Sequence, residues 1–279
     1  MPAILLDRGV LAVGGAEARG FLNGLVTCDM AKVAPGAPAF GALLSPQGKV
    51  LFDFFLVQDD ERFLIDVAAE RAAELAKRLG FYKLRAAVTI EPLPTKRVVA
   101  LLAPEPPTPA RAILFDDPRS GPRRAGADGD DARLGARAIV DARDAAFARD
   151  ASDLYTHARI AATAPEGGLD FVYGDVFPHD VNMDLLHGVA FDKGCYVGQE
   201  VVSRTHHRGL IRRRTRRVSV DGAPPPPGAP ILAGDLVVGA LGSTRDGRGL
   251  AVLRIDRTAE ARAAGADLRA GDALVREDA

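Results

Sequence analysis

The sequence predicts an α+β fold that ends in a small β-barrel. Two observations lead to this class. Helix-patterned and strand-patterned segments do not alternate regularly, which argues against a doubly wound parallel sheet. Beyond the proline-rich stretch 222–228, short apolar runs separated by glycine-rich turns are typical of a barrel or sandwich. A chain of 279 residues is also long for one domain and suggests two or three.

Periodicity places the individual elements. Apolar spacing predicts helices over 16–27 and 153–162, and a short helix near 182–187. Asp66 could cap a helix over 67–79 that Gly80 ends. Strands are expected at 9–13, 49–57, 62–66, 87–91, 96–102, 111–115, 134–140, 230–233, 235–244, 249–256 and 273–277. Segments 104–109 and 116–129 are rich in Pro, Gly, Arg and Asp and are predicted to be exposed loops.

Composition excludes several classes of protein. Hydrophobic residues make up 47% of the chain and charged residues 26%, as in soluble globular proteins, and the formal net charge is −1. That balance gives no electrostatic reason to expect nucleic acid or a membrane as partner. Two cysteines cannot form a disulfide framework, and the N-terminal residues show no signal-peptide pattern. We therefore expect a cytoplasmic protein.

One octapeptide, Lys-Gly-Cys-Tyr-Val-Gly-Gln-Glu at 193–200, is unusually dense in reactive and hydrogen-bonding groups. Cys195 could be an ordinary buried cysteine, but nearby cations, Lys193 and Arg204, lower a thiol pKa and favour the thiolate. Gly198 permits close ligand approach, whereas a Cβ would block it. The predicted catalytic residues are Cys195 and Lys193. The predicted cofactor-binding residues are Tyr196, Gly198, Gln199, Glu200, Arg204 and Asp53.

Each of these side chains also has an ordinary structural explanation. Tyr196 could be a packing residue, or a ring on which a flat heterocycle stacks. Glu200 could form a surface ion pair, or accept hydrogen bonds from a ligand, and Gln199 can both donate and accept. One cysteine cannot hold an iron–sulfur cluster alone, since such clusters usually have four thiolate ligands.

Seven arginines lie between Arg204 and Arg217, and no acidic residue occurs from 201 to 220. Arg204, with Arg208, suits an anion-binding rim. Arg212 to Arg217 suit an alternating strand whose arginines are solvated or paired with acids elsewhere. A nucleic-acid patch is a third interpretation, weakened by the absence of interleaved aromatic residues. His206 and His207 would face opposite sides of a strand, and neither they nor the acidic cluster Asp128, Asp130 and Asp131 is taken as a metal site.

The octapeptide, continued to Arg204 and preceded by the run 177–191, resembles the signature of YgfZ-type folate-binding proteins, relatives of the glycine-cleavage aminomethyltransferase. Weaker similarity covers nearly the whole chain, including 21–29, 43–53, 238–243 and 249–253. The resemblance implies three domains in a clover leaf around a folate-sized opening. These would be a split first domain, 1–45 and 140–205, a second domain, 46–139, and a C-terminal barrel, 206–279.

The resemblance also implies a function. We expect a tetrahydrofolate-type ligand, a role in assembling or repairing iron–sulfur proteins, iron–sulfur assembly proteins or client enzymes as partners, and a required cysteine at position 195. Three residues depart from the family pattern. Ala161 replaces a carboxylate that can pair with the pterin, His179 replaces Gln or Glu, and the chain has no tryptophan. Either Asp53, Asp170 or Glu200 then supplies the pterin partner, or the ligand is a different molecule.

Two other functions remain open at this stage. The first is a tetrahydrofolate-dependent aminomethyltransferase, which would need an acid–base carboxylate near the pterin, with Asp53 as the candidate. The second is a non-catalytic nucleic-acid module that uses the arginine run.

Overall fold

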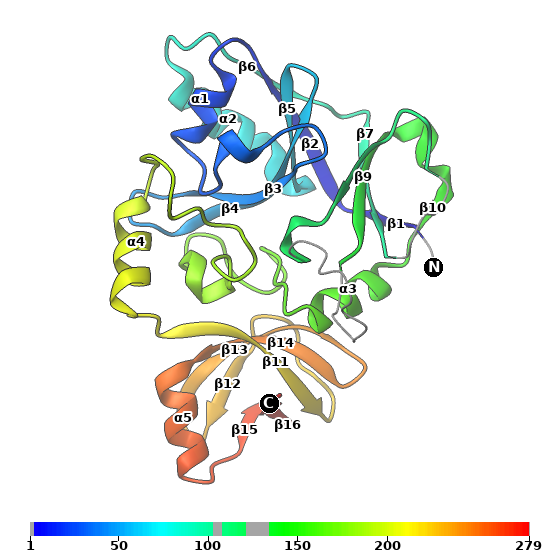
Figure 1. Cartoon of the computed structure of the whole chain (residues 1–279). Helices are drawn as coiled ribbons and strands as arrows, with labels where there is room; N and C mark the ends of the chain where they lie inside the picture. The colour runs from blue at the N-terminus through cyan, green and yellow to red at the C-terminus, as the bar shows by residue number, and fades with distance from the viewer. Residues whose placement is uncertain (1–2, 103–107, 121–133, 279) are drawn as a thin grey trace, which may run out of the picture.

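The computed structural model describes residues 3–102, 108–120 and 134–278. Within these ranges the chain forms two five-stranded sheets and a closed six-stranded barrel, joined by a long segment with little regular structure (Figure 1). The predicted α+β class and the C-terminal barrel are confirmed. The acidic cluster at Asp128 to Asp131 lies outside the described residues.

The first sheet has the strand order β3-β4-β5-β2-β6 and is antiparallel throughout. Its apolar face packs beneath α1 and α2, where Leu22, Phe52, Phe54 and Leu75 are fully or almost fully buried. The elements are β2 (Arg8–Gly14), α1 (Ala18–Asn23), η1 (Met30–Lys32), β3 (Ala39–Leu44), β4 (Val50–Asp59), β5 (Arg62–Ala68), η2 (Ala69–Arg71), α2 (Ala72–Lys83) and β6 (Thr89–Pro92).

The second sheet has the order β10-β1-β7-β9-β8, with β1 and β10 parallel and the other pairs antiparallel. It stands beside the first sheet (Figure 1). Buried residues of both sheets belong to one hydrophobic core. The elements are β1 (Ala3–Leu6), β7 (Lys96–Leu101), β8 (Ile113–Asp116), η3 (Pro118–Ser120), β9 (Ala136–Asp141), η4 (Ala142–Phe147) and β10 (Ala148–Arg149).

Residues 150–210 link the sheets to the barrel and form the middle of the molecule. This stretch contains α3 (Ser152–Ala161), the short 3₁₀ helix η5 (Pro178–Val181) and α4 (Gln199–Arg208). The turns between them bury Phe171, Val176 and Met183 against the sheets. Because α4 ends at Gly209 in the left-handed conformation, the chain turns directly into the barrel.

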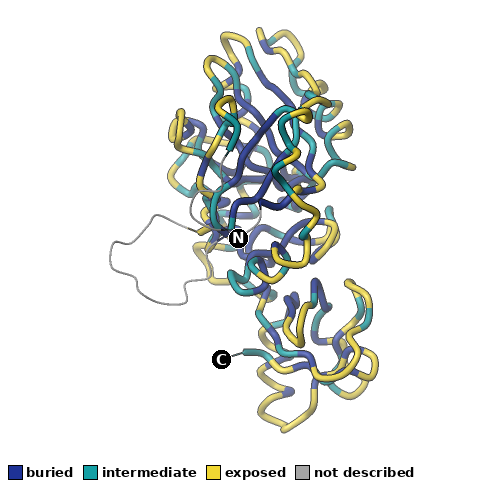
Figure 2. Tube along the Cα trace, turned by 90° about the vertical axis from the view of Figure 1, so that its right-hand side faces the viewer, coloured by how far each residue is buried: buried dark blue, intermediate teal, exposed yellow. Residues whose placement is uncertain are grey.

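The barrel closes in the order β11-β14-β13-β12-β15-β16 around its own apolar core. In Figure 2 the barrel trace carries both buried and exposed residues. The elements are β11 (Arg213–Asp221), β12 (Pro230–Ala233), β13 (Leu236–Arg245), β14 (Arg248–Arg254), α5 (Ile255–Ala263), β15 (Leu268–Ala270) and β16 (Ala273–Glu277).

Several local predictions were wrong. Asp66 does not cap a helix: it lies inside β5, and α2 starts six residues later and continues through Gly80. The helix expected near 182–187 is replaced by turns after η5, because Asn182 and His187 adopt positive φ. The helix α5 and the strand β15 were not predicted.

The strand pairing groups residues across the predicted domain boundaries. The strands β2 and β3 belong to the same sheet as β4, although a boundary was placed at residue 45. The boundaries themselves stay a prediction. No helix among the described residues combines the length and the apolar composition that crossing a membrane requires.

Candidate functional site

The octapeptide forms the irregular loop that leads into α4. Gly198 stands at the start of that helix with φ of 82°. A Cβ at this position would lie 2.6 Å from the carbonyl oxygen of Ser45. Only glycine therefore satisfies both the backbone angle and the close packing of the loop on the β3–β4 turn.

The two cysteines have opposite environments. Cys195 is exposed, whereas Cys28 is buried in the core of the first sheet. Burial raises the pKa of the Cys28 thiol to about 12, against the opposing effect of nearby Lys193. Because the thiolate is the nucleophile and the metal ligand, Cys195 is the thiol that the fold leaves available.

Lys193 is half-buried and fastens the loop to the end of α1. Its Nζ donates to the carbonyl oxygens of Asn23, Val26 and Cys28 at 2.7, 2.8 and 2.7 Å. These three bonds use all three ammonium protons, so no donor remains for a Cys195 thiolate. The role predicted for Lys193 beside Cys195 stays a prediction, and the contacts assign the side chain a positioning role.

The remaining octapeptide side chains point in different directions. Tyr196 is buried, its hydroxyl has no partner within the described part of the chain, and burial raises its pKa to about 12. Glu200 is exposed and accepts a hydrogen bond of 2.6 Å from Arg204, one helical turn later. Gln199 is the first residue of α4 and is partly exposed. The structure therefore does not gather these side chains around one point.

A separate cavity of about 1200 Å³ lies between the turns 168–180, the connection 205–213 and the barrel strands β13 and β14. Five arginines line it: Arg71, Arg212, Arg213, Arg254 and Arg257. Exposed apolar side chains, among them Leu169, Val172 and Leu210, form other parts of its wall. No octapeptide residue is among those lining the cavity.

The three carboxylates considered as pterin partners differ in their availability. Asp53 is buried behind the cavity wall, where it accepts a hydrogen bond from the hydroxyl of Tyr173, a lining residue. Burial is the largest influence on Asp53 and raises its pKa. Asp170 lines the cavity, but both its oxygens already accept hydrogen bonds from the protein. Glu200 stands apart on α4.

Comparisons with known proteins show which family the chain resembles. A family model described as the CAF17 C-terminal beta-barrel domain matches residues 212–277. The human mitochondrial iron-sulfur cluster assembly factor IBA57 is 33% identical over 279 residues, covering 88% of this chain and 75% of that protein. The Mycosarcoma maydis homologue is 34% identical over 240 residues, covering 78% of this chain and 57% of its own length.

The chain belongs to the IBA57 family. The resemblance to YgfZ-type proteins is thereby corrected to a related but different family, because the relatives that match along the chain are IBA57 proteins. The predicted cytoplasmic location was also wrong, since these IBA57 relatives are named as mitochondrial.

The fold of this IBA57-family chain matches that of an aminomethyltransferase. The crystal structure of glycine cleavage system aminomethyltransferase T from Bartonella henselae superposes with a TM-score of 0.68. The match covers 99% of this chain and 84% of that protein at 14% sequence identity. The predicted aminomethyltransferase-type fold is confirmed.

Sequence reasoning missed a buried network of charges between the two sheets. Asp66 accepts hydrogen bonds from Arg8 at 2.6 Å and from Arg137 at 2.9 Å, and Arg8 also reaches Glu166 at 2.8 Å. The network joins four arginines to four carboxylates, all of them buried: Arg8, Arg119, Arg137, Arg159, Asp66, Asp117, Glu166 and Asp170. In the sequence, the only sign of this network is the presence of charged residues at strand positions where apolar residues are expected.

The same network reaches the barrel. Arg159, just before Ala161 at the end of α3, donates to Asp170 and to the hydroxyl of Ser243 in β13. The backbone N–H of Ser243 in turn donates to Asp170 at 2.7 Å. These buried bonds fix the barrel against the middle of the molecule, and Gly242 allows the approach because a Cβ there would lie 2.6 Å from Asp170.

The arginine run follows the strand interpretation. In β11, Arg213 pairs with Asp180, Arg214 with Asp184 and Arg217 with Asp278. Acids elsewhere in the chain therefore neutralise arginines that the sequence shows as an unbroken cationic run. His206 and His207, in contrast, were wrongly placed on a strand: they lie in the last turn of α4.

Proposed function

We propose that this chain assists the assembly of iron–sulfur proteins and that Cys195 is its contact with the cluster or with a partner thiol. Membership of a family whose relatives are named iron-sulfur cluster assembly factors supports the role. The exposure of Cys195, against the burial of Cys28, carries the assignment of the thiol.

Two further features support a cluster-handling cysteine. The loop is held by three bonds from Lys193 and by the tight packing of Gly198, so the thiol is presented from a fixed backbone. A cluster usually has four thiolate ligands, and this chain has two cysteines, one of them buried. The remaining ligands must therefore come from a partner protein or a carrier thiol.

The test compares Cys195→Ala with Cys28→Ala in cells that contain no other copy of the protein. We expect Cys195→Ala to abolish the activity of cluster-dependent enzymes, while Cys28→Ala, matched in chemistry but buried, preserves most of it. Western blotting must show equal amounts of both variants. Full enzyme activity with Cys195→Ala would overturn the proposal.

We also propose that the arginine-lined cavity binds a tetrahydrofolate-type ligand. Its volume suits a flat molecule with an extended tail, and apolar side chains form part of its wall. Of the lining arginines, Arg212 and Arg257 form no ion pair with the described residues and can pair with a ligand carboxylate. This differs from the sequence-based prediction, which placed the ligand against Tyr196, Glu200 and Arg204.

Calorimetry with tetrahydrofolate distinguishes the two placements. If the cavity binds the ligand, Arg212→Ala weakens binding by about tenfold, in proportion to one lost charge-assisted hydrogen bond of about 1.5 kcal/mol, while Glu200→Ala leaves it unchanged. The reverse pattern would place the ligand at the octapeptide. Absence of heat with the wild-type protein would remove folate from the proposal.

The alternative function is aminomethyl transfer to tetrahydrofolate, and the environment of Asp53 supports it. A buried carboxyl with a raised pKa, bonded to a tyrosine in the cavity wall, is a candidate acid–base group. Formation of methylenetetrahydrofolate with a lipoyl-carrier partner, lost in Asp53→Asn, would support this alternative.

A further inference from the structure

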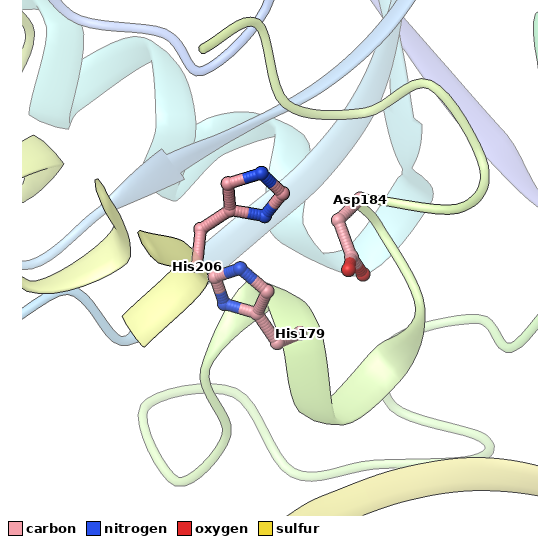
Figure 3. Close-up of side chains that lie close together, drawn as sticks. All are labelled: His179, Asp184 and His206. Carbon is pink, nitrogen blue, oxygen red and sulfur yellow. The ribbon is translucent and has the colours of Figure 1, made fainter. Parts of the chain in front are cut away.

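Three side chains from separate parts of the middle segment meet beside α4: His179 in η5, Asp184 in the following turn and His206 in α4 (Figure 3). One ligand-type atom from each lies within 4.8 Å of the others. The cluster involves no cavity-lining or octapeptide residue, and its three members are separated by up to 27 positions in the chain, so the fold assembles it.

His179 is the unusual member. Its residue exposure is 1%, yet neither ring nitrogen has a hydrogen-bond partner within the described part of the chain. Buried polar groups are almost always partnered, so two unsatisfied nitrogens on one ring need an explanation. A neutral imidazole has one nitrogen lone pair that can bind a metal ion.

Asp184 supplies the carboxylate, and Arg214 holds it in a fixed orientation. The guanidinium of Arg214 donates to both carboxylate oxygens of Asp184, at 2.5 and 2.7 Å, and also to the carbonyl oxygen of His179. A carboxylate offers about four lone-pair sites, so two remain after this pairing. An outer partner that fixes a ligand in this way is a regular feature of metal sites.

His206 completes the group from the solvent side. Its ring stacks on Phe191 with centroids 3.8 Å apart and an interplanar angle of 19°, and faces His179 at 6.0 Å. His206 is exposed, which leaves an entry path for an ion. Two atoms that ligate one ion at about 2.1 Å lie no more than about 4.2 Å apart. Binding therefore requires the ligand atoms to move closer than the 4.8 Å that bounds them here, and the stacked ring of His206 to turn toward the ion.

We propose that His179, Asp184 and His206 bind a divalent transition-metal ion. Two imidazoles and one carboxylate suit zinc and iron(II), and they leave coordination positions open for water or a further ligand. Binding gives the orphaned His179 nitrogen a partner and joins η5 to α4. Because Cys195 is not a member of this group, the metal site and the proposed thiol function can be tested separately.

The experiment uses tag-free full-length protein and Co²⁺, whose visible absorption reports coordination by nitrogen and oxygen, with Zn²⁺ as competitor. Wild type is expected to take up one equivalent of Co²⁺, which Zn²⁺ displaces. His206→Ala should lower the affinity for Co²⁺ by about 100-fold or more. Loss of an outer-shell partner costs about 10- to 100-fold, and loss of a direct ligand should cost at least as much. His206 is exposed, so this variant is expected to fold.

His207→Ala is the matched control, because His207 is the adjacent histidine of the same helix turn and lies outside the cluster. It should bind Co²⁺ like the wild type, as should Cys195→Ala. His179→Leu should also abolish binding, and circular dichroism confirms its fold. Unchanged affinity in His206→Ala, or no uptake by the wild type at millimolar Co²⁺, would overturn the proposal.

Discussion

The buried charge network and the octapeptide loop use similar residue types in opposite ways. In the network, each carboxylate of the set meets an arginine, and the groups are closed off from solvent between the sheets. In the loop, the ammonium group of Lys193 donates all its hydrogen bonds to backbone carbonyls, and the thiol of Cys195 is exposed. The contrast indicates that the network determines the architecture, whereas the loop retains an unsatisfied reactive group for other molecules.

Thiol labelling tests this contrast most strongly. Cys195 should react with a thiol reagent in the native protein at the rate of an exposed cysteine, and Cys28 only after the core opens. We expect the two rates to differ by about a thousandfold or more, because buried groups react through rare openings. Mass spectrometry of single-cysteine variants measures each rate. Comparable rates would mean that the core around Cys28 opens readily.

Removing a network arginine should cost more stability than removing a surface one. Arg137→Met leaves Asp66 and Asp117 short of a buried partner, and we expect a loss of about 3–5 kcal/mol in the free energy of unfolding. Arg216→Ala in β11, which breaks a partly exposed pair with Glu277 of β16, should cost less than about 1 kcal/mol. Urea denaturation measures both, and equal losses would contradict the distinction.

The network also predicts how stability depends on pH. Burial alone would raise the pKa of Glu166, but Arg159 and Arg8 with other arginines lower it from 4.5 to about 2. A depressed pKa stabilises the folded state above pH 4.5, and this contribution of about 3 kcal/mol is lost as the pH falls toward 2. Glu166→Gln should flatten the unfolding free energy across that window relative to wild type. An unchanged slope in Glu166→Gln would show that Glu166 is not stabilised as an anion.

The smallest effect separates two roles of Lys193. Lys193→Met removes three hydrogen bonds to carbonyls, and we expect about 2 kcal/mol of lost stability. Alkylation of Cys195 should change less than about threefold, since the ammonium donates its protons elsewhere. A large fall in the alkylation rate with intact stability would instead support the predicted activation of Cys195 by Lys193.

Local patterns predicted much of the fold but little of the tertiary site. The strands β4 and β7 and the helix α3 follow from apolar periodicity, and the barrel follows from glycine-punctuated short strands. Asp66 was misassigned because its partner Arg8 is 58 residues away. An acid before an apolar run resembles a helix cap unless the distant cation is known.

The candidate site shows the same limit. Eight adjacent residues identified the loop around Cys195, whereas the cavity is built from turns and strands spread between Arg71 and Arg257. In the sequence, His206 stands next to His207 and the two were considered as a pair. In the structure, the ring of His206 faces His179, which lies in another element. Chain adjacency therefore located the reactive loop but could not locate groups that only the tertiary fold brings together.

One exposed sulfur per molecule also limits what oxidation can do. Two copies can be joined through Cys195 by a single disulfide, and because Cys28 is inaccessible, no second link can extend the chain of molecules. Under oxidising conditions the largest covalent species should therefore be a dimer. A reductant should separate the two copies, and the thiol of Cys195 cannot react with other molecules while the disulfide is intact.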